Sequence, residues 1–448
     1  MARTYDIVIL GGGNAGFGVS AVAAAAGKKI AFVEEREFGG TCPNRGCTPK
    51  KVLVAAAHAL HEIEAARAHC IEVGAPRLDW ARLIDREKAM IASIPERLEG
   101  LAKKRGDVYR GRARFAGRNA VAVGGDVLEA ENIVVATGSK PRPLPIAGAD
   151  LLITSDEVLS ERTLPREVVI IGGGVIAMEF SHVYARAGAK VTILEVTPRI
   201  LPGLDDGAVA EVRKESERIG ITIKTGVKVR EIARAGERLR VAYEHDGREA
   251  AAEAERVVNG AGRVANVDTL DLAAADVRHD GVRIEVDPYL RSVSNPSVWV
   301  CGDALVLSAQ LSPLATYEGE IVGRNIVHGA REKPDYAAVP SCVYTVPALA
   351  TVGLTEEKAK AEGLKFSAST NDMRDWLSGR TYAESVAWAK VLIEEGSGRI
   401  LGAHMVGHSG EELIHLFALA MKHGITAKQL KQSVFAFPTF SADMKSLV

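Results

Sequence analysis

Two stretches of the chain repeat one pattern, in which an apolar strand is followed by a glycine-rich turn and a helix. In the first stretch the strand is residues 6–10, the turn is 11–16 (GGGNAG), the helix is 19–26, and a second strand over 28–33 ends at Glu34. In the second stretch the corresponding segments are 168–171, 172–177 (GGGVIA), a helix through Ala187, and 190–194 ending at Glu195. The helix N-terminus of such a unit binds a pyrophosphate, and the terminal carboxylate accepts ribose hydroxyls. The sequence therefore predicts an α/β chain with two Rossmann-like dinucleotide-binding domains.

Two dinucleotide sites imply that electrons pass from one dinucleotide to the other. The residues assigned to the first site are Gly11, Gly13, Asn14, Ala15, Gly16 and Glu34, and those assigned to the second are Gly172, Gly174, Val175, Ile176 and Glu195. Ala177 replaces the third glycine of the second turn, which the motif tolerates. Glu195 would repel a 2′-phosphate, which favours NADH over NADPH. Arg199 follows closely and would soften that preference.

A close pair of cysteines, Cys42 and Cys47, follows the first turn in the run GGTCPNRGCTPKK over residues 39–51. Two cysteines at this spacing can close a small disulfide ring, and an exposed or strained disulfide beside an electron source is a redox catalyst. Pro49 fits the first turn of a helix, and a helix N-terminus lowers the pKa of a nearby thiol. Arg45 and two lysines add positive charge. The sequence therefore predicts a redox-active disulfide.

The length, charge and cysteine content of the chain exclude several classes of protein. A chain of 448 residues is long enough for roughly three domains. Its net charge of −1, with 25% charged residues, gives no basic field for nucleic acid or an anionic membrane. Five cysteines are too few for a disulfide scaffold. The chain shows no signal peptide at its start and no apolar run of ~20 residues, so we expect a cytoplasmic protein without a membrane span. We assign no residue to a metal site.

The run over residues 39–51 resembles the active-site signature of the flavoprotein disulfide reductases, which include glutathione reductase, dihydrolipoamide dehydrogenase and mercuric reductase. The likeness covers nearly the whole chain through the segments 136–138 (ATG), 262–266 (GRVAN), 301–303 (CGD) and 311–315 (LSPLA). It implies FAD and NADH as cofactors, with NADPH as the alternative. The further cofactor-binding residues that it implies are Gly40, Thr41, Ala136, Thr137, Gly138, Gly262, Asp303, Leu311 and Ala315.

The resemblance also implies a domain order. FAD would bind a domain formed by residues 1–150 and 268–333, and an NAD(P)-binding domain, residues 151–267, would be inserted between these two parts. Residues 334–448 resemble the α+β dimerisation domain, and Pro334 marks the boundary. Members of the family are homodimers, because the partner's C-terminal segment completes each active site.

By the same resemblance, hydride passes from NADH to FAD and electrons then reach the disulfide. Cys47 would lie nearer the flavin and form the charge-transfer thiolate, and Cys42 would be the interchange thiol that attacks the substrate. Either Lys50 or Lys51 would lie near flavin N5 and pair with Glu179, and the sequence does not choose between the two lysines. A cation there stabilises reduced flavin, and its carboxylate partner keeps the buried charge paired.

The C-terminal segment departs from the family pattern. Alignment on Pro438 and Thr439 places Phe437 where the family has its proton-carrying histidine, and Ala442 where it has the glutamate that orients this histidine. General acid–base help is worth roughly 10²–10⁴-fold in rate. We therefore expect an acceptor that needs no delivered proton: an activated disulfide, a persulfide, a metal ion, a quinone or a carbon electrophile. Asp443 is the alternative for a substitute acid, and His408 and His415 are the alternatives for a substitute histidine.

Three functions follow from this departure. The first is an NAD(P)H-dependent FAD oxidoreductase with a redox-active disulfide and an atypical acceptor. The second is reductive C–S cleavage with carboxylation, because the ketopropyl-coenzyme-M oxidoreductase/carboxylase is similar in having phenylalanine at the histidine position. The third is a non-enzymatic flavin redox sensor. The presence of both cysteines, both glycine turns and Glu179 favours an enzyme.

Overall fold

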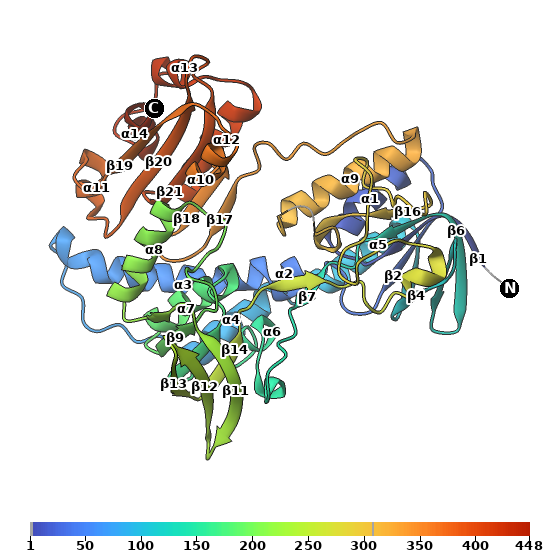
Figure 1. Cartoon of the computed structure of the whole chain (residues 1–448), viewed down its shortest axis with the longest axis horizontal. Helices are drawn as coiled ribbons and strands as arrows, with labels where there is room; N and C mark the ends of the chain where they lie inside the picture. The colour runs from blue at the N-terminus through green and yellow to red at the C-terminus, as the bar shows by residue number, and fades with distance from the viewer. Residues whose placement is uncertain (1–2, 307–308) are drawn as a thin grey trace. The chain divides into compact units, whose positions relative to one another are not determined.

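The computed structural model describes residues 3–306 and 309–448, and the chain divides into two compact units, whose elements are labelled in Figure 1. Unit 1 comprises residues 1–50, 86–142 and 263–336, and unit 2 comprises residues 51–85, 143–262 and 337–448. The helices α3 (Cys47–Ala65) and α4 (Trp80–Ile91) each contain residues of both units. The domain boundaries that the resemblance implies stay predictions.

Unit 1 is built on a seven-stranded sheet with a parallel centre. Its strands, along the order of the sheet, are β3 (Asp107–Arg110), β2 (Ile30–Glu34), β1 (Arg3–Leu10), β6 (Asp126–Val135), β5 (Ala120–Val123) and β4 (Ala113–Gly117), and β16 (Val298–Val300) pairs with β6. β1 is parallel to both β2 and β6, so the carboxyl ends of these strands meet at one edge. Residues Ile7 and Ile9 are fully buried, as expected for a central parallel strand.

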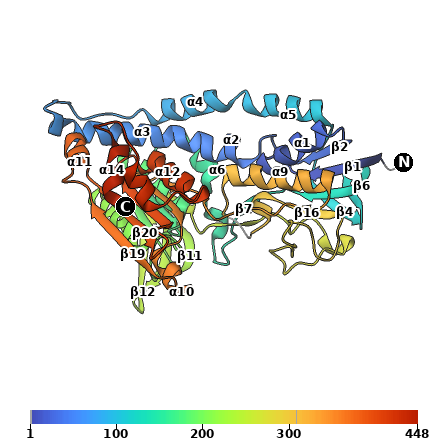
Figure 2. The same ribbon diagram turned by 90° about the horizontal axis from the view of Figure 1, so that it is seen from above.

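Two helices of unit 1, α1 (Asn14–Ala25) and α9 (Ser312–His328), pack closely along each other (Figure 2). Glycines allow this approach, because a Cβ atom at Gly319 would lie only 2.2 Å from the carbonyl oxygen of Ala15. The smaller elements of unit 1 are α2 (Thr41–Arg45), α5 (Ile94–Arg105), η3 (Leu272–Ala275), η4 (Gly302–Ala304) and the antiparallel pair β7 (Ser139–Pro141) and β15 (Arg263–Ala265).

The first part of unit 2 repeats the parallel design in a smaller sheet. Its four strands, in order, are β10 (Thr222–Lys224), β9 (Lys190–Leu194), β8 (Glu167–Ile171) and β14 (Arg256–Asn259), all parallel. The main helices are α7 (Val175–Arg186) and α8 (Asp206–Arg218), and an antiparallel sheet is formed by β11 (Lys228–Ala235), β12 (Arg238–His245) and β13 (Arg248–Ala254). The short elements are α6 (Ser155–Val158), η1 (Ala66–His69) and η2 (Ala149–Leu151).

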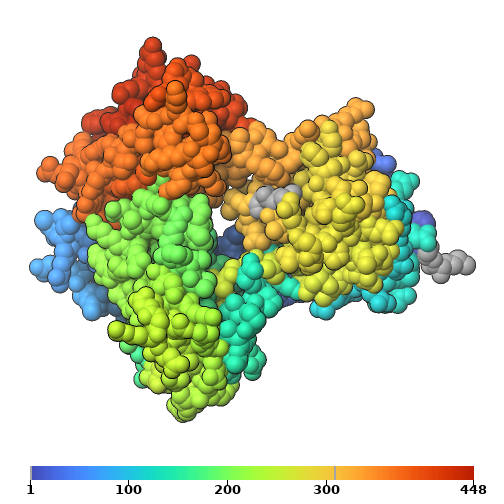
Figure 3. Space-filling model, in the orientation of Figure 1, coloured from blue at the N-terminus to red at the C-terminus, as the bar shows by residue number. Residues whose placement is uncertain are grey.

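The C-terminal part of unit 2, orange to red in Figure 3, is an antiparallel sheet with helices. The strands, in order, are β17 (Ser341–Val343), β18 (Leu349–Gly353), β21 (Ile400–Gly407), β20 (Ala387–Glu394) and β19 (Phe366–Asp372). The helices are α10 (Glu356–Ala361), α11 (Leu377–Tyr382), α12 (Gly410–Lys422), α13 (Ala427–Gln432) and α14 (Phe440–Leu447). The predicted fold class, two Rossmann-like parts and a C-terminal α+β part, is therefore confirmed.

Local differences from the sequence prediction are small and have simple causes. The first fingerprint helix begins at Asn14 rather than at residue 19, because the last residues of the glycine turn are already helical. The strand that follows begins at Ile30 rather than at residue 28, since Gly27 ends the preceding turn with a φ of +71°. Within residues 3–306 and 309–448, no helix combines the length and apolar character needed to span a membrane.

Candidate active site

The first glycine turn, at the carboxyl end of β1, begins where the chain passes very close to the segment 136–138. Gly11 has a φ of +114°, and a Cβ atom there would lie 2.2 Å from the carbonyl oxygen of Ala136. Glu34 accepts hydrogen bonds from the backbone N–H groups of Gly12 and Arg36, both at 2.7 Å. The cap of α1 is Gly13, which has no side chain to satisfy the first N–H groups of the helix. This geometry suits a pyrophosphate at the helix N-terminus.

Four segments that are distant in the sequence meet beside this turn in unit 1. Ser139, directly after the turn 136–138, donates a hydrogen bond to Asp303 at 2.8 Å. Arg263 donates to the hydroxyl of Ser139 at 2.8 Å and thereby brings in the segment 262–266. Asn14 contacts Ser312 of the segment 311–315.

This cradle has the properties that bound FAD requires. The hydroxyl of Thr137 is buried, and none of the described residues hydrogen-bonds to it. A Cβ atom at Gly302, where φ is +67°, would lie 2.9 Å from the Cβ atom of Ala15. An unpaired buried hydroxyl beside glycine-lined backbone fits a polar ligand that closely approaches the chain.

The two cysteines lie at the junction of α2 and α3 as free thiols in hydrogen-bond contact, the geometry of a reduced redox pair. The hydrogen bond with Cys47 lowers the pKa of Cys42 to about 6, and Ser312 and Lys50 act in the same direction against partial burial. Pro49 lies in the first turn of α3, as predicted. The guanidinium of Arg45, which was expected to support the thiolate, is paired with Glu37, and its support of the thiolate stays a prediction.

The two candidate lysines have different surroundings. Lys50 is buried and close enough to Cys42 for its charge to lower the pKa of that thiol. The ammonium group of Lys51 instead lies 3.7 Å from the centre of the Tyr344 ring, within unit 2. Glu179 is buried on α7 and accepts a hydrogen bond from the backbone N–H of Tyr344 at 2.9 Å. The pairing of Glu179 with a lysine stays a prediction.

The second glycine turn repeats the architecture of the first. A Cβ atom at Gly172, where φ is +104°, would lie 2.4 Å from the carbonyl oxygen of Gly260. Glu195 accepts hydrogen bonds from the N–H groups of Gly173 and Thr197, as Glu34 does in the first turn. The guanidinium of Arg199 is paired with Asp206 and donates to the carbonyl of Leu204 at 3.2 Å.

Phe437 and His408, the two C-terminal candidates, differ in their exposure to solvent. Phe437 lies between α13 and α14, and 76% of it is exposed. The His408 side chain is fully buried, and its Nε2 atom lies 3.0 Å from Asp443. His408 therefore has no open path to a substrate in unit 2, and the carboxylate of Asp443 already has a partner. Glu384, the second partner of His408, could not be identified from the sequence, because it belongs to no motif.

Comparison with known proteins agrees with this geometry. Residues 5–319 match the family model described as pyridine nucleotide-disulphide oxidoreductase, and residues 339–448 match its dimerisation domain. The chain belongs to this family of oxidoreductases.

Relatives of this oxidoreductase extend over almost its full length. It is 32% identical to a glutathione reductase of Burkholderia cepacia, with 99% of this chain and 98% of the relative covered. It is 33% identical to a dihydrolipoyl dehydrogenase of Halobacterium salinarum, with 97% and 94% covered. A solved structure described as the Cu(II) complex of the HOCl-induced flavoprotein disulfide reductase RclA of Escherichia coli, a cysteine-to-serine mutant, matches with a TM-score of 0.89. That match has 25% identity and covers 100% of this chain and 99% of the other.

Membership confirms the predicted flavoprotein disulfide reductase family, an enzymatic role, and FAD and NAD(P)H as cofactors. The first glycine turn with the Thr137 cradle would hold FAD, and the second turn with Glu195 would hold the nicotinamide dinucleotide. The individual residue assignments stay predictions.

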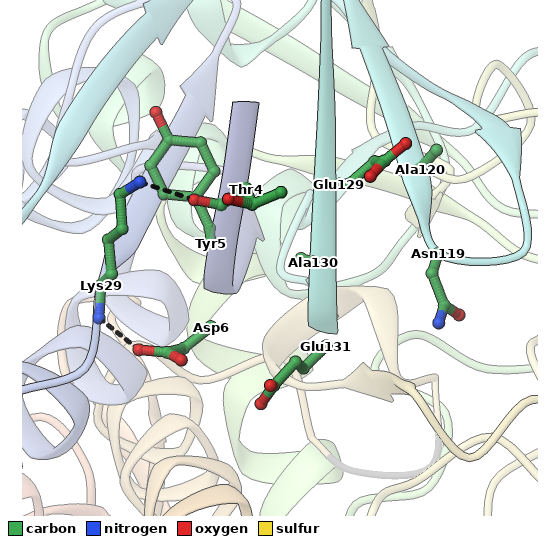
Figure 4. A pocket seen from close by; sticks show the side chains of 9 residues that line it. All are labelled: Thr4, Tyr5, Asp6, Lys29, Asn119, Ala120, Glu129, Ala130 and Glu131. Carbon is green, nitrogen blue, oxygen red and sulfur yellow. Dashed lines mark hydrogen bonds between the residues drawn. The ribbon is translucent and has the colours of Figure 1, made fainter. Parts of the chain in front are cut away.

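A hollow of about 630 Å³ elsewhere in unit 1 of the oxidoreductase does not belong to this site (Figure 4). It is lined by Thr4, Tyr5 and Asp6 at the amino end of β1, together with Lys29 and residues 129–131 of β6. In doubly wound sheets, ligands bind at the carboxyl ends of the strands. The hollow lies at the amino end of β1, opposite the glycine turn, and so is not at the edge of the sheet where such ligands bind.

Proposed function

We propose that this enzyme passes two electrons from NADH, through FAD, to the Cys42–Cys47 pair and from there to an acceptor that needs no proton from a histidine. The acidic thiol of Cys42 beside Cys47 carries this proposal. When bound, FAD supplies the step that takes hydride from the nicotinamide and reduces the disulfide. The balance is one NADH, one proton and one disulfide giving NAD⁺ and two thiols.

Cys42 would serve as the nucleophile. A thiol with a pKa of about 6 is mostly thiolate at neutral pH, and the thiolate is the attacking form. Cys47 donates the hydrogen bond that stabilises this thiolate, and the positive charge of Lys50 adds to the effect. Cys42 can thus begin an exchange reaction without a histidine to remove its proton.

The C-terminal segment supports the choice of acceptor. Phe437 carries no titratable proton, and the buried His408 does not replace a proton carrier. An acceptor with a good leaving group, such as an activated disulfide or a persulfide, suits such a site because expelling that group needs little acid help. A quinone and a carbon electrophile are the other organic acceptors that need no proton from a histidine.

A metal ion is the second candidate for the acceptor. The RclA structure that matches the whole chain is described as a Cu(II) complex. Two neighbouring thiols provide the soft ligands that copper prefers in its reduced state. Reduction of two Cu(II) ions to Cu(I) would consume the two electrons of one NADH.

NADH is the proposed donor because of the charges at the second glycine turn. By the pattern of the motif, the carboxylate of Glu195 would face the 2′ position of the bound ribose and repel a 2′-phosphate. The cation that could offset it, Arg199, is paired with Asp206. Because Asp206 neutralises Arg199, the negative charge of Glu195 is not offset and would repel the 2′-phosphate of NADPH.

We infer that the enzyme acts as a homodimer, since residues 339–448 match the family's dimerisation domain. Phe437, exposed in the single chain, would then face the partner's cysteine pair. A lone redox-active cysteine pair is typical of a cytoplasmic protein, where structural disulfides are rare.

An anaerobic titration of the FAD-loaded protein with NADH tests the proposal. A long-wavelength charge-transfer absorbance after two electrons is expected, because Cys47 would lie beside oxidised flavin and become the thiolate once the proton that it shares with Cys42 moves to Cys42. Turnover with an activated aromatic disulfide, Cu(II), a quinone and a ketone-bearing thioether would then identify the acceptor class. Bleaching of the flavin without that absorbance would show that electrons bypass the disulfide and would overturn the proposed route. If NADH did not reduce the flavin at all, the protein would be a redox sensor and not an enzyme of this kind.

A further inference from the structure

A buried histidine in the C-terminal part of unit 2 lies outside the redox machinery described above. His408 directly follows β21, and its side chain is fully buried. The backbone at Gly407, His408 and Ser409 has φ values of +72°, +56° and +52°. The left-handed region is unfavourable for residues with a side chain, and such strain persists only where the surrounding contacts require it. The contacts of the His408 side chain are those that hold the backbone in this conformation.

The imidazole of His408 bridges two carboxylates from different parts of the domain. Nδ1 lies 2.7 Å from Glu384, which also accepts the backbone N–H of His408 at 2.7 Å. Nε2 lies 3.0 Å from Asp443 on α14. Ser378, on α11, donates its hydroxyl hydrogen bond to the same carboxylate oxygen of Asp443. The histidine thus links the end of β21 and the loop after α11 to the C-terminal helix.

Both ring nitrogens of His408 take part in this link. Nδ1 is within hydrogen-bond distance of Glu384 and Nε2 is within hydrogen-bond distance of Asp443, so the ring cannot turn without breaking both contacts. Loss of one partner would leave a buried polar group without its hydrogen bond, which is unfavourable.

The link extends to Phe437 through the start of α14. The hydroxyl of Thr439, the N-cap of α14, accepts from the N–H of Ala442 at 3.2 Å and donates to the carbonyl of Ala436 at 2.7 Å. The Phe440 ring lies with its centre 4.6 Å from that of His408. Residues on both sides of Phe437 are therefore tied to the helix that the histidine holds.

We propose that His408 is a positioning residue of the acceptor half-reaction, because its buried side chain fixes α14 through Asp443 and α14 fixes the segment that carries Phe437. This inference rests on the proposed function, in which that segment contributes to the acceptor site. It also explains why a histidine and an acid are present in this domain although neither is placed as a proton carrier. Asp443, one position after Ala442, would stabilise the position of α14 and would not transfer a proton.

The test compares His408→Gln and Asp443→Asn in the FAD-loaded enzyme. Hydrogen–deuterium exchange of the amides over residues 440–447 should become about tenfold faster in each variant, because the local opening of α14 is no longer opposed. The double variant should exchange more slowly than the product of the two single effects would give, since both substitutions remove the same contact between His408 and Asp443. Flavin reduction by NADH should be unchanged, while the KM for an activated aromatic disulfide rises several-fold.

Glu356→Gln is the matched control, because it removes a carboxylate from the buried Lys390 in the same domain without touching α14. Equal exchange over residues 440–447 in His408→Gln and wild type, or an equal gain in Glu356→Gln, would overturn the proposal. Additive effects in the double variant would do the same. The exchange readout does not depend on turnover, so failure of NADH to reduce the flavin would count against the proposed function alone.

Discussion

The ammonium group of Lys51 lies 3.7 Å from the centre of the Tyr344 ring, while the neighbouring Lys50 is buried and acts electrostatically on Cys42. Consecutive helical residues point in directions about 100° apart, so the two side chains leave α3 in different directions. A cation over an aromatic ring is stabilised where it lies. Lys50 is therefore the lysine that we expect to influence the redox centre, and Lys51 supports the packing of Tyr344.

Substitution of the two lysines should separate these roles. In Lys50→Met, the loss of a positive charge beside the redox centre should slow flavin reduction by NADH by about tenfold or more, since such groups stabilise developing negative charge. Lys51→Met is the matched control and should change that rate less than about threefold. Anaerobic stopped-flow measurement of flavin absorbance gives both rates. Equal losses in the two variants would show that the structure does not distinguish the lysines.

The acidity of Cys42 should be visible in its alkylation by iodoacetamide. In the reduced enzyme the rate should rise with pH through about 6 and become constant well above it, because the hydrogen bond with Cys47 lowers the pKa of Cys42 to that value. In Cys47→Ala the missing hydrogen bond should move the midpoint to higher pH. Cys42→Ser identifies the background from other thiols. An unchanged midpoint in Cys47→Ala would contradict the assigned cause.

The parts of the site that the sequence predicted are those set by local pattern. Each glycine turn and the cysteine pair lie within one short run, and each acid ends the next strand of the same strand–turn–helix–strand unit, so the motif itself indicates these residues. The family resemblance then placed Asp303 beside the first turn. Tertiary contacts were not predictable in the same way. Arg45 pairs with Glu37, and Arg199 pairs with Asp206, and no sequence motif indicated either ion pair.

The preference for NADH should weaken when the charges at the second glycine turn are changed. Glu195→Gln removes the repulsion of a 2′-phosphate, and Asp206→Asn releases Arg199 from its ion pair. The double variant should lower the ratio of kcat/KM for NADH over NADPH by about tenfold or more. Adding Arg199→Met should reverse most of the gain with NADPH. A ratio that does not change in a folded double variant would contradict the charge argument.

Close packing of α1 on α9 should make Gly319 intolerant of a side chain. In Gly319→Ala the new methyl group would lie 2.2 Å from the carbonyl oxygen of Ala15, so the helices must separate. The variant should lose about 1–3 kcal/mol of the free energy of unfolding, measured by denaturant titration. Gly100→Ala, on α5, is the control, because no atom lies within 4 Å of its added Cβ. That variant should be neutral or more stable by about 0.5–1 kcal/mol.

Restoring a histidine and a glutamate to the C-terminal segment should restore conventional disulfide reduction. In Phe437→His with Ala442→Glu, a proton carrier and its orienting acid return to the positions where the family resemblance places them, and turnover with an alkyl disulfide should rise by about tenfold or more. Phe437→Leu is the control, because it removes the aromatic ring without supplying a proton. Ala442 lies in the first turn of α14, where an added carboxylate favours the helix N-terminus, so the double variant should fold. A folded double variant with no gain over Phe437→Leu would show that the acceptor step is limited by something other than proton delivery.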